Sequence, residues 1–157
     1  MLLHETFSAE MIKTGLEAED KDEVFEELVD HFCQATGIQA RADILEAVRT
    51  RESKMSTGIK KGIGIPHGKT DAADKVCGVL GISRSGIDYD ALDGEPVFLV
   101  FMLLAPKKDS ENHLRLLKRL AELLDNPQFY TDIIACTSAE SANAVIKKYE
   151  EILISLD

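Results

Sequence analysis

Residues 97–105 read VFLVFMLLA, and this apolar stretch decides the class of fold. A second stretch, residues 76–82, is also nearly continuous in apolar character. Strands that are covered on both faces have such sequences, whereas half-exposed strands alternate apolar and polar residues. We therefore predict two central strands, which helices must cover on both faces.

Amphipathic patterns before these strands indicate two of the covering helices. A helix near 21–36 is predicted from a capping box that joins Asp20 to Glu23, and it ends at Gly37. A second helix, about 40–53, carries Arg51 in its last turn, where a cation suits the helix dipole. Between it and the strands lies a glycine-rich segment, 58–68, which predicts short extended pieces joined by a tight turn, with His67 where the strand stops.

Further helices are predicted after the strands. Pro127 opens a short helix, and a capping box from Thr137 to Glu140 precedes the last one. Apolar residues recur at helical spacing in two sets, which we expect to face the core: Leu114, Leu117, Leu120, Ala121 and Leu124, then Ala142, Val145, Ile146, Tyr149, Ile152 and Leu153. The pattern predicts an α/β layered fold, with helices packed on a hydrophobic sheet of unassigned strand order.

Composition limits the class of protein. The 157 residues, 45% of them hydrophobic, suit a single domain over 1–157 with a substantial core. No apolar run approaches the ~20 residues of a membrane span, and no signal peptide is expected. Cys33, Cys77 and Cys136 are an odd number without CxxC spacing, which favours a reducing compartment, the cytoplasm.

Charge separates two classes of partner. A net charge of -10 argues against a nucleic-acid surface, which needs clustered Lys and Arg. Residues 49–69 nevertheless contain six Lys or Arg and one acid, Glu52. This stretch is either a helix end and loop with solvated cations or a local anion site. Protein or small-molecule partners fit the remaining surface.

His67 is a candidate nucleophile. Pro66 before it and Gly68 after it present the imidazole on a stiff backbone that a bound group can approach closely. A neutral imidazole is nucleophilic near pH 7, so it can carry phosphate. Taken alone, however, a histidine beside Pro and Gly is more often an ordinary turn residue than a nucleophile.

His113 and Arg51 are candidate phosphate-binding residues. His113 lies at the start of a predicted helix, where N–H groups and the dipole favour an anion, although a first-turn histidine can instead point to solvent. Arg51 offers a planar, permanently charged fork for phosphate oxygens. The alternative for Arg51 is a surface ion pair with Glu52 or Glu46.

The remaining histidines offer no further site. His31 lies inside the first predicted helix, and His4 belongs to a terminus that is expected to fray. No paired His or Cys spacing predicts zinc, and neither GxxxxGK[ST] nor GxGxxG occurs. We therefore expect no metal and no cofactor, and any phosphate must come from a partner.

Several motifs together resemble the type 2 IIA proteins of the bacterial sugar phosphotransferase system, the fructose, mannitol and nitrogen-regulatory class. The resemblance covers nearly the whole chain and is carried by Arg51-Glu52, Ser56-Thr57-Gly58-Ile59, residues 62–68 (GIGIPHG), residues 86–94 (GIDYDALDG), residues 103–106 (LLAP) and residues 113–117 (HLRLL). It implies a mixed β-sheet flanked by helices.

The resemblance also implies roles for the three candidates. His67 would be the phosphoacceptor, His113 a second active-site histidine, and Arg51 the arginine that faces the phosphoryl group. The implied reaction takes phosphate from the phosphohistidine of the small phosphocarrier protein and passes it to a cysteine of a IIB domain. Because the chain ends soon after its last predicted helix, we expect IIB on a separate chain.

Two departures from the family pattern bear on partner choice. The family usually has Gly where Lys60 stands and Ala where Gly64 stands, so we expect an altered turn before His67 and an added charge. Three functions fit the residues: a transfer intermediate in sugar uptake, a regulatory protein switched by His67 phosphorylation, and an interaction domain without transfer. Intact His67, His113 and Arg51 count against the third.

Overall fold

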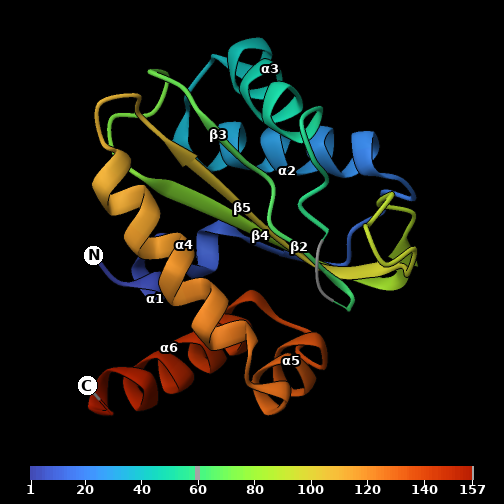
Figure 1. The fold of residues 1–157 in the computed structure, drawn as a ribbon, viewed down its shortest axis with the longest axis vertical. Helices are drawn as coiled ribbons and strands as arrows, with labels where there is room; N and C mark the ends of the chain where they lie inside the picture. The colour runs from blue at the N-terminus through green and yellow to red at the C-terminus, as the bar shows by residue number, and fades with distance from the viewer. Residues whose placement is uncertain (59–60, 157) are drawn as a thin grey trace.

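A computed structural model describes residues 1–58 and 61–156 and places a β-sheet between two layers of helices (Figure 1). Ile59, part of one family-like motif, and Lys60, a predicted departure from the family pattern, lie outside this part of the chain. In chain order the elements are α1 (Leu3–Thr6), η1 (Ala9–Met11), β1 (Ile12–Thr14), α2 (Lys21–Thr36), α3 (Arg41–Glu52), β2 (Ile63–Gly64), β3 (His67–Lys69), β4 (Cys77–Ile87), β5 (Val97–Ala105), α4 (Ser110–Leu124), α5 (Pro127–Ile134) and α6 (Ala139–Ser155).

The sheet is mixed. Strands β4 and β5 form its antiparallel centre, and β1 runs parallel to β4 at one edge. On the other side of β5, β2 and β3 pair with it in parallel, at successive positions along the same strand. Ile63 aligns with Leu99, and His67 aligns with Leu103. This topology confirms the mixed sheet that the family resemblance implied and supplies the strand order.

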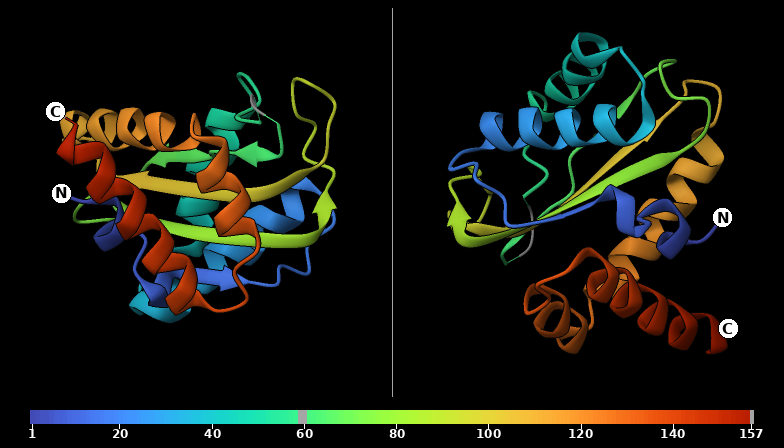
Figure 2. Two further views of the ribbon diagram at one scale, coloured as in Figure 1. Left: turned by 90° about the horizontal axis from the view of Figure 1, so that it is seen from below. Right: turned by 180° about the vertical axis from the view of Figure 1, so that it is seen from behind.

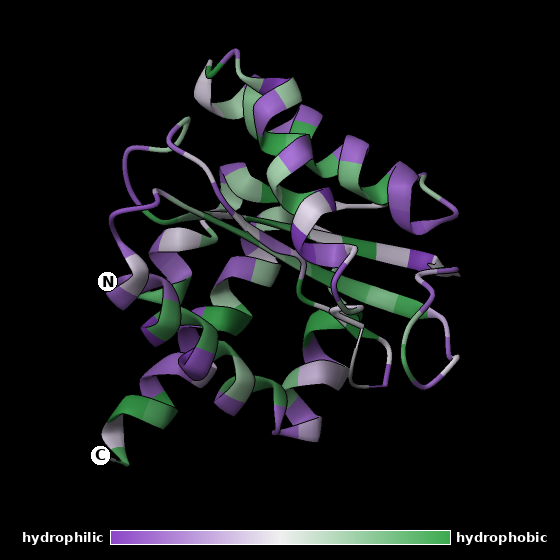
Figure 3. Ribbon diagram, turned by 45° about the horizontal axis from the view of Figure 1, so that its top comes forward, coloured by the Kyte–Doolittle hydropathy of each residue, from purple (hydrophilic) through white to green (hydrophobic). Residues whose placement is uncertain are grey.

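Strand β5 separates two hydrophobic clusters, as the VFLVFMLLA run predicts. From Leu99 onward, alternate side chains pack into opposite clusters, Phe101 on one face and Met102 on the other. Helices α2 and α3 cover the face that carries Met102, while α1, α4, α5 and α6 cover the face that carries Phe101 (Figure 2). Figure 3 shows the hydrophobic residues concentrated in the central strands. Burial of each large apolar side chain stabilises the fold by about 1.5–3 kcal/mol relative to leaving that side chain exposed to water.

Local signals placed several boundaries correctly. The Asp20 carboxylate accepts from the Glu23 backbone N–H at 2.9 Å, and Gly37 ends α2 with a φ of 77°. Pro127 begins α5 as predicted. The capping box forms only in part. In a complete box the Glu23 carboxylate would accept from the backbone N–H of Asp20, but here it accepts from the backbone N–H of Glu19. Helix α6 is capped by Ser138 and not by Thr137.

The buried stripe of α4 differs from the prediction. Leu114 is 65% exposed, and Ala121 is exposed as well. The residues that face the core are His113, Leu116, Leu120, Leu123 and Leu124. Leu120 and Leu124 are buried as predicted and Leu117 packs against the core, whereas His113 takes the buried place in the first turn that the apolar pattern had assigned to Leu114.

The N-terminus is anchored, so the expectation that His4 frays is wrong. Glu150 of α6 is fully buried and accepts from the Leu3 backbone N–H at 2.6 Å and the His4 backbone N–H at 3.1 Å. The His4 Nδ1 atom lies 2.9 Å from the same carboxylate, and Arg119 approaches it at 3.4 Å. The buried apolar stripe of α6 is shorter than predicted, because Ile152 is 48% exposed.

Candidate active site

His67 is presented by a proline-interrupted edge of the sheet. It is the first residue of β3, and not the last residue of a strand as predicted. Pro66 has no N–H and separates β3 from β2, while its carbonyl accepts from the Leu103 N–H at 3.0 Å. The imidazole therefore projects from a backbone that the central strand β5 holds in place.

Gly68 brings β3 against helix α3. A Cβ atom at this position would lie 2.9 Å from the Ala47 carbonyl carbon and 3.0 Å from the Val48 nitrogen. Both are backbone atoms that cannot move aside without displacing the helix. The missing side chain thus allows the close approach that sets the last turn of α3, with Arg51, beside His67.

The His67 ring has one nitrogen held and one nitrogen free for chemistry. Its Nδ1 atom lies 3.0 Å from the Ile65 carbonyl oxygen. A carbonyl only accepts, so Nδ1 carries the hydrogen, and in the neutral ring Nε2 keeps a lone pair. Burial lowers the pKa of His67, the Ile65 hydrogen bond opposes this, and the Arg51 charge lowers it further. The ring is therefore neutral and nucleophilic at physiological pH.

His113 is buried beside His67 and does not point to solvent. Its side chain is 3% exposed, and the two ring centroids are 5.5 Å apart at an interplanar angle of 75°. Burial, with the nearby His67 and Lys69, lowers the pKa of His113 to about 4. Its Nε2 atom is buried without a hydrogen-bond partner among the described residues. A polar atom left in this state is costly unless a bound group satisfies it.

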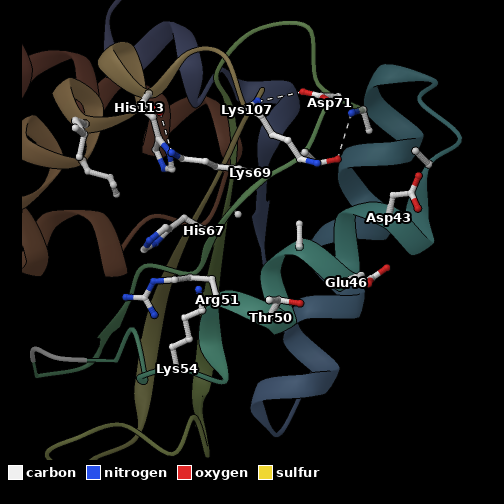
Figure 4. A pocket seen from close by; sticks show the side chains of 18 residues that line it. Asp43, Glu46, Thr50, Arg51, Lys54, His67, Lys69, Asp71, Lys107 and His113 are labelled. Atoms are coloured by element: carbon white, nitrogen blue, oxygen red, sulfur yellow. Dashed lines mark hydrogen bonds between the residues drawn. The ribbon is translucent and has the colours of Figure 1, made fainter.

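Arg51 lines the same pocket. Its Nη1 atom donates to the Met55 carbonyl at 2.8 Å, which leaves the rest of the guanidinium available. Within residues 1–58 and 61–156 no acid pairs with Arg51, and Glu52 instead turns inward to Lys21. The alternative of a surface ion pair with Glu46 or Glu52 is therefore wrong. Figure 4 shows His67 between His113 and Arg51.

The pocket has a volume of about 1030 Å³ and extends from His113 along the outer face of α3. Arg51, Lys54 and Lys69 of the basic stretch line it, whereas Arg49 faces away and pairs with Asp22 and Glu26. Lys60 lies outside the described residues. Lys69 was not predicted as a site residue, although it follows His67 by two residues and so lies on the same face of the strand.

Ser110 and Lys107 complete the charged rim near the start of α4. The Lys69 ammonium donates to the Ser110 hydroxyl at 2.8 Å, and Lys107 lines the pocket beside it. No local pattern marks these two residues, because only the fold brings α4 next to β3. Arg51, Lys69 and Lys107 thus make the part of the pocket near His67 cationic, which suits an anion, while the acids Asp43, Glu46 and Asp71 line the rest of it.

A family model described as "Phosphoenolpyruvate-dependent sugar phosphotransferase system, EIIA 2" matches residues 5–149. The chain belongs to this family. The match confirms the predicted resemblance, and it covers every residue that lines the pocket. The chain is an EIIA type 2 protein.

Known relatives of this EIIA protein include a fructose-specific component and a nitrogen regulatory protein. The fructose-specific EIIABC component of Bacillus subtilis is 33% identical over 96% of the chain, which spans 24% of that protein. The nitrogen regulatory protein IIA-Ntr of Neisseria meningitidis is 29% identical, with a TM-score of 0.83 over 92% of this chain and 98% of that one. A complex of enzyme IIAMTL and phosphorylated enzyme IIBMTL from Escherichia coli shares the fold at 20% identity, a TM-score of 0.74, and 90% and 96% coverage.

The predicted departure at Gly64 coincides with a tight packing contact in this EIIA protein. A Cβ atom at Gly64 would lie 2.8 Å from the Cζ atom of the Tyr89 ring, and Tyr89 is fully buried. The aromatic ring fills the space that an alanine methyl would need. The absence of a side chain at this position therefore accommodates Tyr89.

The described residues contain no metal-ligand cluster and no membrane span. In residues 1–58 and 61–156, no group of three or more His, Cys, Asp or Glu side chains is arranged to hold a metal ion. No helix in this part of the chain is long and apolar enough to cross a bilayer. Independence from metal remains a prediction, to be tested with a chelator.

The depressed pKa of His113 predicts that the EIIA fold loses stability in weak acid. In the unfolded chain a histidine has a pKa near 6.5. Between about pH 6.5 and pH 4, His113 is therefore protonated in the unfolded state and neutral in the folded state, so falling pH favours unfolding. We expect a loss on the order of 1–3 kcal/mol in the free energy of unfolding over this range, because each unit of pKa difference corresponds to at most about 1.4 kcal/mol. Urea unfolding should show a smaller loss for His113→Gln, and equal losses for both proteins would contradict the assignment.

Proposed function

We propose that this EIIA protein takes a phosphoryl group onto Nε2 of His67 from the phosphohistidine of the small phosphocarrier protein and passes it to a IIB component on a separate chain. The observation that carries the proposal is the His67 ring itself. Its Nδ1 atom is bound to the Ile65 carbonyl, so the free lone pair on Nε2 lies in the pocket shared with His113 and Arg51.

The transfer exchanges one P–N bond for another. The Nε2 lone pair of His67 attacks phosphorus as the bond to the donor imidazole breaks, and the electron pair of that bond returns to the donor nitrogen. Onward transfer to a IIB cysteine breaks the P–Nε2 bond and forms a P–S bond. Throughout, the Ile65 carbonyl holds the Nδ1 proton, which stabilises the positive charge that develops on the phosphorylated ring.

The phosphoryl oxygens need positive partners, and the pocket offers them. We assign Arg51 to the equatorial oxygens through its unused N–H groups. We assign a hydrogen on Nε2 to His113, where it donates to a phosphoryl oxygen, and this satisfies an atom that otherwise has no partner. The N-terminal turn of α4 adds its dipole.

The partners that we propose are proteins. Leu114 on the pocket rim is 65% exposed and Met55 beside Arg51 is 58% exposed, so apolar surface flanks the charged site. The net charge of -10 disfavours nucleic acid. With the three free cysteines, these features support a cytoplasmic role for residues 1–157 as one IIA unit without direct membrane insertion.

A regulatory role is the second candidate. The structural likeness to a nitrogen regulatory protein at 29% identity favours a protein whose His67 phosphorylation state controls binding to another protein. Uptake and regulation use the same His67 chemistry and differ in the acceptor. A phosphorelay with purified general components separates them, when intact mass is read under alkaline conditions that preserve phosphohistidine.

In that relay we expect one phosphate on the wild-type chain. Loss of that phosphate to an added IIB component supports uptake, whereas retention in the presence of a range of IIB components supports regulation. A wild-type chain that never gains phosphate from the charged carrier would contradict both roles.

Arg51→Lys should slow transfer without unfolding the domain. Lysine keeps the positive charge but loses the planar fork that holds two phosphoryl oxygens and the Met55 carbonyl at once. We expect a decrease of about 10-fold in the rate of phosphate gain from the charged carrier, measured by rapid quench, which is less than the ~10²- to 10³-fold cost of removing a whole donor because lysine keeps the charge. Arg49→Lys, which alters a surface ion pair of the same helix, is the control and should transfer at the wild-type rate.

The same assay tests the prediction that no metal takes part. EDTA, added after the carrier has been phosphorylated, should leave the rate of transfer to His67 unchanged. Loss of transfer with EDTA, or a wild-type rate for Arg51→Lys, would show that Arg51 does not neutralise the phosphoryl charge.

A further inference from the structure

A buried carboxylate lies next to Arg51 in the chain and points away from the pocket. Glu52 is 8% exposed. Its oxygens accept from the Thr57 backbone N–H at 2.8 Å and from the Thr57 hydroxyl at 2.7 Å, and Lys21 pairs with it at 3.0 Å. Glu52 thus folds the turn that follows α3 back onto the helix end, with its negative charge fully paired.

Thr57 connects this turn to the His67 ring. The Thr57 carbonyl accepts from the Ile65 backbone N–H at 3.2 Å. The carbonyl of that same residue, Ile65, accepts from His67 Nδ1. The Thr57 hydroxyl is also 2.8 Å from the Tyr89 hydroxyl, deep in the core. The position of Ile65, and with it the proton on His67, therefore depends on a threonine outside the pocket.

The same turn also holds Arg51. Its guanidinium donates to the carbonyl of Met55, which lies within the turn between Glu52 and Thr57. Displacement of the turn would therefore move the arginine as well as the histidine. Within residues 1–58 and 61–156, neither side chain makes a second hydrogen bond that would hold it in place if this turn moved.

The aromatic ring of Tyr89 limits how far the turn can move. A Cβ atom at Gly58, the residue after Thr57, would lie 2.9 Å from the ring, and one at Gly64 would lie 2.8 Å from it. Tyr89 therefore packs between the turn and β2. Close packing on one side and a paired carboxylate on the other therefore restrict movement of the turn.

We propose that Glu52 and Thr57 are positioning residues, which set the Nδ1–H tautomer of His67 and the place of Arg51 through one turn. Neither residue touches the phosphoryl group. This inference rests on the proposed role of His67, but its first readout, the tautomer of the unphosphorylated ring, does not depend on transfer. The carrier reaction supplies a second readout.

The test compares Thr57→Val with Thr57→Ser. Valine keeps the shape and the backbone N–H of Thr57 but removes the hydroxyl that joins Glu52 to Tyr89, whereas serine restores it. In nitrogen-15 spectra of the histidine rings we expect Nδ1–H to dominate in the wild type, both tautomers to appear in Thr57→Val, and Nδ1–H to return in Thr57→Ser. Phosphate gain should slow by ~10- to ~100-fold in Thr57→Val and recover in Thr57→Ser.

Thr6→Val is the matched control, because Thr6 is also a buried threonine and its hydroxyl bonds to the Leu2 carbonyl far from the site. This variant should lower the stability of the fold but leave the His67 tautomer and the rate of phosphate gain unchanged. If Thr57→Val does not fold, Tyr89→Phe removes the other hydroxyl of the pair and should give smaller changes in the same direction. A folded Thr57→Val or Tyr89→Phe with the wild-type tautomer and rate would overturn the proposal. Failure of the wild type to gain phosphate would instead contradict the proposed function.

Discussion

His67→Ala is expected to gain no phosphate from the charged carrier protein under conditions in which the wild type gains one. The variant removes the Nε2 atom that we assign as the nucleophile, while the backbone of β3 remains paired with β5. No other side chain in the pocket combines a neutral ring nitrogen with partial access to solvent, since His113 is 3% exposed. Intact mass under alkaline conditions measures the phosphate directly.

His31→Ala is the matched control for this experiment. His31 bonds to the Glu10 carbonyl on the exposed side of α2, away from the pocket, so the variant should gain phosphate as the wild type does. Full labelling of His67→Ala would show that phosphate enters at another residue and would remove His67 from the centre of the mechanism.

His113→Ala is expected to fold and to accept phosphate ~10²- to 10³-fold more slowly, which is the usual effect of losing one donor to a developing charge. The buried Nε2 atom has no partner in the described part of the chain, and the site lies at the N-terminal turn of α4. Rapid-quench kinetics in both directions, from the carrier and back to it, measure the effect.

His113→Gln separates donor loss from the loss of packing. The glutamine amide can place an N–H near the position of the histidine Nε2 atom, so we expect it to recover part of the rate that alanine loses. If His113→Ala transfers at the wild-type rate in both directions, the donor role of His113 is wrong. If alanine and glutamine slow transfer equally, His113 acts by packing against His67.

The elements that the sequence predicted well are those encoded by local patterns. The apolar run of β5 is nearly continuous because both of its faces are covered, and its bounds, Val97–Ala105, match the prediction. Asp20 and Gly37 delimit α2 through a side-chain cap and a left-handed residue, which are interactions between near neighbours. His67, His113 and Arg51 were also found from chemistry and resemblance, and the structure places all three in one pocket.

The features that the sequence did not predict depend on contacts between distant residues. The first residue of α1, Leu3, donates its backbone N–H to Glu150, 147 positions away, and no local pattern reveals this bond. Leu114 was assigned to the core because a histidine was not expected to take a buried position on α4. The link from Thr57 to Tyr89 spans 32 positions and joins two motifs that looked independent in the sequence.

The most direct measurement of the central claim is the site of phosphate on the ring. In nitrogen-15 and phosphorus-31 NMR spectra of the phosphorylated wild-type protein, phosphorus should couple to Nε2 of His67, while Nδ1 keeps its hydrogen toward the Ile65 carbonyl. Coupling of phosphorus to Nδ1, or to a ring other than that of His67, would contradict the account.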